Sequence, residues 1–441
     1  MAIDIPNPIP GYDSAEHPAP PVVLTQPGLP IRRADIDPDA LKIMGRLQRM
    51  GFVAYLCGGA VRDLMLGRRP KDYDIATDAR PGQIKKRFAN VFVIGRRFRL
   101  AHVHCPGGKI IEVATFRREL ERGDDVDPSV PPDPQAIYGT PREDAFRRDI
   151  TINALYYDPA IDAVIDYVGG LEDMRARRVR TIGEPGVRFA EDPVRVWRVL
   201  RHAARLGFEV EAVTARAIPD FGHLLATASG ARLYEEFNKD LAYETRPVFE
   251  ALRANRLLGH ILGAMGLAYE TDPALFAKIS ALLDVEERAR RGGFQLAPEE
   301  MYALVFWPWL EPLFDTPEED MVPVLAAAIQ NAGMRMTIPK TLRANAVHIL
   351  VLVDALRSAL RTGQVRSALL HRAHVSQALR LLSLIAEGRP PAEGETFETL
   401  LRRVHPEAAV EERMKRRRRR RRGRRNRGGG GSPAASDGSS T

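Results

Sequence analysis

Three carboxylates near the start of the chain have the spacing expected of a metal-binding cluster. Asp72 and Asp74 are one residue apart, and Asp72 lies fourteen residues after Gly58. Glu112 follows in the apolar run KIIEVAT, residues 109–115. Residues i and i+2 of a β-strand face the same side of a sheet, so Asp72 and Asp74 are expected to point together. If the run 109–115 pairs with a nearby strand, Glu112 completes the cluster.

A cluster of three carboxylates costs free energy unless cations neutralise it, because like charges held together repel. Hard divalent ions such as Mg²⁺ take oxygen ligands and commonly share them with the phosphates of a substrate. The cluster therefore predicts metal-assisted phosphoryl or nucleotidyl transfer, with Asp72, Asp74 and Glu112 as metal ligands and catalytic residues.

The elements that must position this cluster alternate between helices and short strands. Helical periodicity marks residues 36–50, and strand-like runs follow at 52–57, 72–76, 91–94, 101–105, 109–115 and 150–168. Gly58 and Gly59 separate the strand 52–57 from a helix, which is a common design for binding anions: glycine lets backbone N–H groups approach a phosphate, and the helix dipole favours negative charge. From about residue 185 helical stretches dominate, including 191–206 and 247–267. The expected fold class is α+β, with a small mixed sheet and helices followed by an all-α region.

Composition narrows the classes of protein further. The chain has 441 residues with 44% hydrophobic content and only two cysteines, Cys57 and Cys105. So few cysteines argue against a disulfide framework, and neither lies in a zinc-binding C-x-x-C pattern. No apolar run is long enough to span a membrane, and no signal peptide is recognisable. We therefore expect a cytoplasmic protein without a membrane partner, and a monomer is the default expectation for its oligomeric state.

The positive charge is concentrated at the C-terminus. Residues 413–427 contain twelve arginines or lysines, whereas the net charge of the whole chain is +8, so the remainder carries about −4. Like charges at that density repel and resist packing, so a disordered tail is expected over 411–441. Guanidinium-rich segments bind phosphate backbones through charge and counterion release. The tract predicts RNA contacts by Arg416, Arg417, Arg418, Arg419 and Arg420, with a solubility or localisation tail as the alternative.

The first motif resembles that of a known family, the class II tRNA nucleotidyltransferase and bacterial poly(A) polymerase superfamily. The family's Gly-Gly, Val-Arg-Asp and Asp-x-Asp signature is matched within residues 58–74, and a second signature is matched by RRDITINAL, residues 147–155. The segment RFAEDPVRVWR, residues 188–198, resembles the family's base-recognition motif Glu-Asp-x-x-Arg.

This resemblance implies a polymerase-β-like nucleotidyltransferase head and assigns roles to particular residues. It implies nucleotide binding by Gly58, Gly59, Arg62, Arg148, Asp149, Asn153, Asp192, Arg195 and Arg198. Asp192 and Arg195 are expected to share a helix face and to read the edge of a base with one acceptor and one donor group. Alternatives are a surface ion cluster for the second motif and an ordinary intrahelical salt bridge for the third.

The resemblance also implies a division of the chain. We expect a disordered leader over 1–30, a nucleotidyltransferase head over 31–175, a helical neck over 176–245, a helical body over 246–410 and the basic tail. The neck is expected to hold the base-recognition and RNA-binding motifs.

Several features favour poly(A) polymerases over CCA-adding enzymes within the superfamily. The stretch GRRFRLAHV, residues 95–103, the segment ARLYEEFNKDL, residues 231–241, and the arginine-rich C-terminus all resemble the poly(A) polymerases. The second segment suggests RNA contacts by Arg232 and Lys239. The expected reaction is transfer of AMP from ATP to an RNA 3′ end with two Mg²⁺ ions and release of pyrophosphate. CCA addition and a non-catalytic RNA-binding adaptor are the alternatives.

Overall fold

The computed structural model describes residues 20–95, 99–119, 137–315, 320–365, 367–392 and 394–404. The chain forms two compact units. The first holds the chain up to Arg232 together with Glu250–Leu257, and the second holds Leu233–Phe249 and the chain from Leu258 onward. The finer division into head, neck and body stays a prediction.

The first unit is built round one mixed sheet, with strands in the order β1-β8-β7-β2-β3-β6-β5-β4. Neighbouring strands are antiparallel except β3 and β6, which run parallel. The sheet confirms the expected α+β class. Its strands are β1 (Val22–Thr25), β2 (Ala54–Cys57), β3 (Asp74–Thr77), β4 (Val91–Ile94), β5 (Leu100–His104), β6 (Ile110–Thr115), β7 (Leu155–Asp158) and β8 (Ala163–Asp166).

The strands are short and apolar because they lie inside the unit. Every residue of β2 is buried, as expected of a central strand that is covered on both faces. On one face a cluster of aromatic rings forms the core: the ring of Tyr156 lies 6.1 Å from the rings of Tyr55, Phe116 and Tyr167. Burial of aromatic rings is the main favourable term that fixes this face of the sheet.

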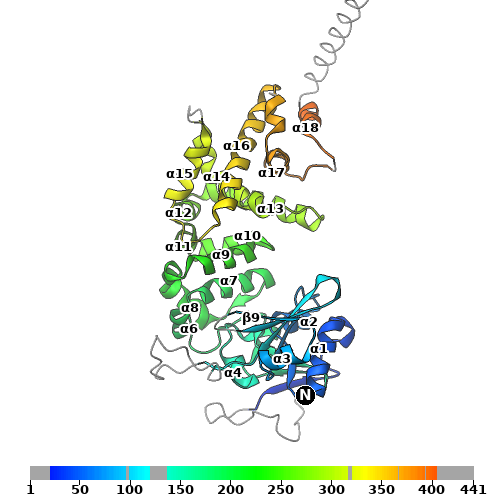
Figure 1. Ribbon diagram of the computed structural model, residues 1–441. Coiled ribbons are helices and arrows are strands. Elements are labelled where there is room, and N and C mark those ends of the chain that lie inside the picture. Colours follow the sequence, from blue (N-terminus) through cyan, green and yellow to red (C-terminus); the bar gives the residue numbers. More distant parts are fainter. Residues whose placement is uncertain are drawn as a thin grey trace, which may run out of the picture. The chain divides into compact units, whose positions relative to one another are not determined.

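Helices α1 (Pro38–Arg49), α2 (Gly59–Met65) and α3 (Pro81–Arg87) pack against the strands of the sheet (Figure 1). Helix α1 contacts β2 and β3, helix α2 contacts β2 and β7, and helix α3 contacts β4 and β5. Asp37 caps α1 by accepting hydrogen bonds from the backbone N–H groups of Asp39 and Ala40. Helix α4 (Pro141–Phe146) begins with a capping box between Thr140 and Glu143.

After β8 the first unit becomes mainly helical. The elements are α5 (Gly170–Arg175), α6 (Pro185–Glu191), α7 (Val194–Leu206) and α8 (Ala212–Phe221), with a short parallel pair of strands, β9 (Arg178–Val179) and β10 (Glu209–Val210). The amphipathic helix α7 buries Trp197, Val199 and Leu200 along one stripe.

The described part of the second unit is helical, in agreement with the expected all-α region. The chain passes between the units within α9 (Gly230–Leu241), within α10 (Thr245–Ala254) and again between Leu257 and Leu258. The others are α11 (Leu258–Leu262), α12 (Ala264–Thr271), α13 (Pro273–Arg291), α14 (Pro298–Leu310), α15 (Met321–Asn331), α16 (Lys340–Thr362), α17 (Val375–Glu387) and α18 (Phe397–Val404). Trp307 on α14 is buried and serves as core.

Three element boundaries differ from the sequence-based expectation. Strand β3 begins at Asp74, so Asp72 precedes it rather than belonging to it. The expected helix 191–206 is two helices, because Pro193 lies between α6 and α7 and its ring cannot continue α6. The expected helix 247–267 is interrupted at Arg256 and Gly263, both of which have positive φ angles.

No helix in the described ranges is both long enough and apolar enough to cross a membrane.

Candidate active site

Two of the three carboxylates predicted to bind metal, Asp74 and Glu112, belong to neighbouring strands of the sheet, and Asp72 lies just before the first of these strands. Strands β3 and β6 run parallel with Ile75 opposite Val113, so Asp74 lies beside Glu112, one step earlier in the same register. Asp74 is also paired with Cys57 of β2, whose side chain belongs to the aromatic core face. Asp72 precedes Asp74 by two residues in an extended segment. The parallel register brings Glu112 next to Asp74 although 38 residues separate them.

The carboxylates interact electrostatically, and the effect is seen in the pKa of Asp74. Asp74 is open to solvent at the start of β3, but packing atoms round it, together with the charges of Glu112 and Asp72, raise its pKa to about 6. Within the described ranges, no three acidic, histidine or cysteine side chains stand close enough to hold a metal ion in this conformation. The cluster thus has the donor chemistry of a hard-cation site, and the metal assignment stays a proposal.

Glu112 is positioned by a histidine on the neighbouring strand. His102 of β5 pairs with Glu112 in the antiparallel register, and its Nε2 lies 3.3 Å from Glu112 Oε1. His102 therefore contacts a candidate metal ligand from the neighbouring strand, and this contact orients the carboxylate of Glu112.

The Gly58 turn brings backbone close to a buried guanidinium. Gly58 has φ +73° and forms the N-cap of α2, and its N–H donates to the carbonyl of Leu155 over 3.2 Å. A Cβ at this position would meet Arg148 Nη1 at 3.2 Å. Only glycine combines a relaxed positive φ with this close approach, so the turn and Arg148 form one structural feature.

Arg148 is held by an internal network centred on the buried carboxylate of Asp144, which it shares with Arg147. Its Nη2 donates to Asp144 Oδ2 over 3.0 Å, and the hydroxyl of Tyr156 donates to the same oxygen over 2.8 Å. Arg147 occupies the other oxygen, Asp144 Oδ1. Burial opposes ionisation of Asp144, but Arg148, Arg147 and Tyr156 together hold its pKa below the usual value. The second motif is therefore a buried ion network rather than a surface cluster.

Arg188, which the sequence analysis did not single out, fastens this motif to α6. Its Nη2 donates to the carbonyls of Arg147 and Arg148, over 2.9 and 3.1 Å, and its Nη1 pairs with Glu119 and with Glu191. The side chain is buried. It lies in the RFAED segment, but no local spacing distinguishes an arginine that binds carbonyls 40 residues away.

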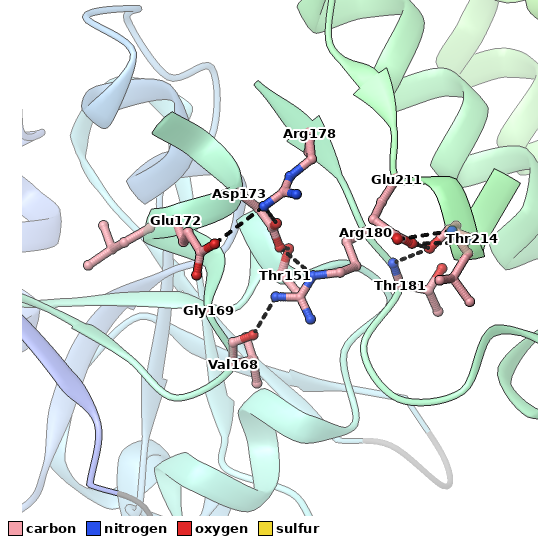
Figure 2. Close-up of polar contacts among 12 residues, drawn as sticks. Thr151, Val168, Gly169, Glu172, Asp173, Arg178, Arg180, Thr181, Glu211 and Thr214 are labelled. Atoms are coloured by element: carbon pink, nitrogen blue, oxygen red, sulfur yellow. Dashed lines mark hydrogen bonds and ion pairs between the residues drawn. The ribbon is translucent and has the colours of Figure 1, made fainter. Parts of the chain in front are cut away.

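A second network fixes the residues just before Asn153 (Figure 2). Asp173 is fully buried, and its Oδ2 accepts from Thr151 Oγ1 over 2.8 Å and from Arg180 Nε over 2.7 Å. Gly169 has φ +85°, and a Cβ there would lie 2.8 Å from Arg180 Nη2, so glycine is required beneath that guanidinium. These contacts anchor the short helix η3 (Thr151–Asn153) from which Asn153 projects.

The predicted base-reading pair has a different geometry from the one expected. Asp192 is the C-cap of α6, whereas Arg195 belongs to α7, so the two do not share a helix face. Asp192 Oδ2 instead accepts from Arg232 Nη2 over 2.7 Å, and Arg195 Nη1 donates to the carbonyl of Arg188 over 3.1 Å. Arg198 Nη1 lies 3.6 Å from Asp149 Oδ2, which joins α7 to the second motif.

Arg62 and Asn153 meet directly, together with a residue that the sequence analysis missed. Arg62 Nη1 donates to Asn153 Oδ1 over 2.8 Å, and both side chains contact the imidazole of His202 on α7. The contact joins residues 140 positions apart. The alternation of polar and apolar residues on α7 would place His202 on the helix but could not reveal its partners.

The remaining predicted residues fall into two groups. Lys239 on α9 pairs with Glu236 over 3.1 Å, in the second unit. Arg416–Arg420 and Arg96, Arg97 and Phe98 of the GRRFRLAHV stretch lie outside the described residues.

A cavity of about 750 Å³ lies in the first unit beside the Asp72–Asp74 segment. Tyr73 contributes to its lining, with Arg68, Arg69 and Lys109 among the charged residues. None of the three candidate metal ligands lines it, so the cavity is separate from the carboxylate cluster.

Taken with the strand order, the carboxylate cluster and the glycine turn define the head as a polymerase-β-like nucleotidyltransferase fold. The sequence matches the family model described as "Poly A polymerase head domain" over residues 54–180 and the model described as "Probable RNA and SrmB- binding site of polymerase A" over residues 207–265. The chain is 37% identical over 384 residues to Poly(A) polymerase I of Escherichia coli O6:H1, covering 82% of this chain and 81% of that protein. It belongs to the poly(A) polymerase family.

Two further similarities bear on the site. Poly(A) polymerase I of Salmonella typhimurium is 41% identical over 295 residues, covering 64% of this chain and 62% of that protein. The chain thus spans less than two thirds of the Salmonella relative. The crystal structure of the Bacillus stearothermophilus CCA-adding enzyme in complex with CTP is 28% identical with a TM-score of 0.61, covering 84% of this chain and 82% of that chain.

Proposed function

We propose that this chain is a polynucleotide adenylyltransferase that transfers AMP from ATP to RNA 3′ ends. The 3′-hydroxyl oxygen forms a bond to the α-phosphorus, the bond from that phosphorus to the bridging oxygen breaks, and pyrophosphate leaves with its electron pair. The hydroxyl proton passes to solvent. The observation that carries the proposal is the carboxylate cluster, with Asp74 beside Glu112, in a chain of the poly(A) polymerase family.

The carboxylates supply the part of the site that meets the reacting phosphate. Asp72, Asp74 and Glu112 would hold two Mg²⁺ ions, whose charge assists attack by the hydroxyl and departure of pyrophosphate. The raised pKa of Asp74 supports this assignment, since the repulsion that raises it is what a bound cation relieves. His102 keeps Glu112 oriented toward its neighbours.

The cationic side of the site would bind the nucleotide. Arg148 is already oriented by Asp144 and Tyr156 beneath the Gly58 turn, so it loses little side-chain freedom when a phosphate arrives. Gly58 and Gly59 would let the backbone approach the phosphates. Asp149 and Asn153 would contact the sugar.

Adenine selection would depend on how Asp192 and Arg195 are held. Arg232 fixes Asp192, and the carbonyl of Arg188 fixes Arg195, so each group has a preset direction although they lie on different elements. Arg198 would act beside them through Asp149. A base edge can be read by such an acceptor and donor when both are rigid.

RNA would be held by cationic groups away from the reacting atoms. We propose that Lys239 and the arginine tract that includes Arg416–Arg420 contact the phosphate backbone without reading sequence. The family match over residues 207–265 supports an RNA-binding role for the region that contains Arg232 and Lys239.

CCA addition is the second candidate, because a CCA-adding enzyme bound to CTP shares the fold. One experiment separates the two activities. Purified full-length protein with Mg²⁺ is given a labelled generic RNA, or a tRNA ending before CCA, with each nucleotide alone and with ATP plus CTP. Extension of the generic RNA by ATP alone, in many steps, is expected. Addition confined to the tRNA and dependent on CTP would establish CCA addition, and no product with any nucleotide would remove the enzymatic proposal.

A further inference from the structure

Arg62, Asn153 and His202 form a closed triangle of polar contacts beside the glycine turn. Arg62 Nη1 lies 2.8 Å from Asn153 Oδ1 and 3.3 Å from His202 Nδ1, and Asn153 Nδ2 lies 3.2 Å from His202 Nε2. The other contact of the guanidinium is with Asp63, at 2.7 Å from Nη2. Three elements meet here: Arg62 comes from α2, Asn153 from η3 and His202 from α7.

No assignment of protons satisfies all three contacts of the triangle. The guanidinium can only donate, so it requires an acceptor on both Asn153 and His202. If the amide oxygen of Asn153 faces Arg62, the amide N–H₂ faces His202 and also requires an acceptor. A neutral imidazole has one acceptor nitrogen and one N–H, so one donor always meets another donor. Exchanging the amide oxygen and nitrogen of Asn153 moves the mismatch to Arg62 and does not remove it.

A charged imidazole makes the triangle worse. Both ring nitrogens would then carry protons, and two of the three contacts would join donor to donor. The surroundings act in the same direction: burial, followed by the charges of Arg62, Arg201, Arg205 and Arg198, holds the pKa of His202 well below its usual value. His202 is therefore neutral, and the triangle is one hydrogen-bond acceptor short.

We propose that His202 is a positioning residue that keeps one donor, on Arg62 or Asn153, free for an oxygen of the incoming nucleotide. The oxygen supplies the acceptor that the triangle lacks, so the nucleotide completes a network that the protein leaves incomplete. This rests on the proposed function, since it assumes that the nucleotide binds beside Arg62 and Asn153. Because His202 lies on α7, it also couples nucleotide binding to the helix that carries Arg195 and Arg198.

Two substitutions separate hydrogen bonding from shape. His202→Gln offers a carbonyl oxygen that can accept from both donors, so the free donor is lost and the Kd for ATP should rise about fivefold, the effect of one hydrogen bond. His202→Phe keeps a ring of similar size but accepts nothing, so the Kd for ATP should stay within about twofold of the wild type. Equal weakening by both substitutions, or no change with His202→Gln, would overturn the proposal.

Thermal unfolding gives a readout that does not depend on catalysis. Without nucleotide, His202→Gln should be at least as stable as His202→Phe, because it satisfies the donors; with ATP, its Tm should rise less than that of the wild type. His223, an exposed histidine of the first unit, provides the control, and His223→Gln should leave both values unchanged. If the Gln variant does not fold, His202→Phe decides alone: a fivefold loss of ATP affinity with a native-like Tm contradicts the proposal.

The source of the acceptor oxygen is resolved with three ligands. If a phosphate oxygen is bound, His202→Gln should weaken tripolyphosphate and ATP alike. If the ribose 2′-hydroxyl is bound, the penalty should be present with ATP and absent with 2′-deoxy-ATP and tripolyphosphate. ATP binding is measured directly on the full chain without RNA. A protein that binds ATP normally but does not extend RNA would refute the proposed function, whereas the binding data would still decide whether His202 has the proposed role.

Discussion

The site contains a cationic group, Arg147 and Arg148, and an anionic group, Asp72, Asp74 and Glu112. The two groups differ in how the protein compensates their charge. On the cationic side, Arg147 and Arg148 share the carboxylate of Asp144, to which the hydroxyl of Tyr156 also donates, so the protein itself supplies a counter-charge. On the anionic side, burial and the charges of Glu112 and Asp72 raise the pKa of Asp74 despite the opposing charge of Arg148, and His102 contacts Glu112. The difference indicates that the cationic group is preorganised by a buried carboxylate, whereas the anionic group keeps a carboxyl whose pKa lies above its usual value.

This contrast predicts different results when each group loses a charge. A carboxylate that is held in a repulsive cluster contributes to function at a cost in stability, as functional groups often do. A carboxylate that is bonded to guanidiniums inside the protein contributes to stability, because its removal leaves a buried charge without a partner.

The largest effect is expected for Asp74→Asn. The amide removes a metal-binding charge, so transfer of AMP to RNA should fall at least about 100-fold, which corresponds to several kcal/mol of lost transition-state stabilisation. Stability should stay the same or increase, because the repulsion with Glu112 and Asp72 is removed. The rate of RNA extension in the presence of Mg²⁺ measures transfer, and urea unfolding in the absence of divalent ions measures stability. Loss of both together would contradict the contrast, and Glu172→Gln, at a highly exposed carboxylate, is the control.

Asp144→Asn should have the opposite pattern. Its carboxylate is nearly inaccessible and bonds Arg147, Arg148 and Tyr156, so the free energy of unfolding should fall by about 3 kcal/mol. Asp39→Asn is a matched control, because Asp39 pairs with Lys109 nearer the surface and should cost well under 1 kcal/mol. Urea unfolding at neutral pH checks both. A loss below about 1 kcal/mol for Asp144→Asn would mean that the network is not what holds Arg148.

Local spacing predicted much of this site. The Gly58 turn follows from an apolar strand that is followed by two glycines. The strand period placed Asp74 on β3 but not Asp72, which precedes the strand. The parallel pairing of β3 with β6 was needed to bring Glu112 to Asp74, and the sequence could state it only as a condition.

Long-range packing could not be predicted from the sequence in the same way. Pro193 was visible, but the expectation that Asp192 and Arg195 share a helix ignored its effect on α6, and the pair has a different geometry in the structure. Arg188 and His202 bind partners 40 and 140 positions away, and neither has a distinctive local pattern. Such contacts depend on how α6 and α7 pack against the head, which periodicity does not encode.

The pH dependence of the free energy of unfolding should also distinguish the anionic group from the cationic group, with a smaller effect than the substitutions of Asp74 and Asp144. The native pKa of Asp74 is about 6, above the ordinary value of 3.8, so the native state binds more protons than the unfolded state between about pH 4 and 6. Stability therefore falls as pH rises through that window, by about 1 kcal/mol after allowance for solvent screening. Asp144, whose pKa is lowered, loses its stabilising effect only on further acidification.

Other carboxylates titrate in the same range, so the test is a difference between two proteins. The stability of Asp74→Asn relative to wild type should increase from pH 4 to pH 6 and then level off, as measured by urea unfolding in the absence of divalent ions. A difference that is constant with pH would show that Asp74 titrates normally and that the anionic group is not repulsive.

The smallest predicted effect tests whether Glu112 is one source of the repulsion that raises the pKa of Asp74. Glu112→Gln removes one of the two charges that raise the pKa of Asp74, so that pKa should move toward its ordinary value. Part of the pH-dependent difference described for Asp74 should disappear, a change of a few tenths of a kcal/mol because water screens the exposed carboxylates. Glu172→Gln again supplies the control, and the same urea measurements from pH 4 to pH 6 suffice. If Glu112→Gln leaves the pH dependence as it is in the wild type, burial and Asp72 raise the pKa of Asp74 without Glu112, and the parallel pairing of β3 with β6 does not create a shared anionic site.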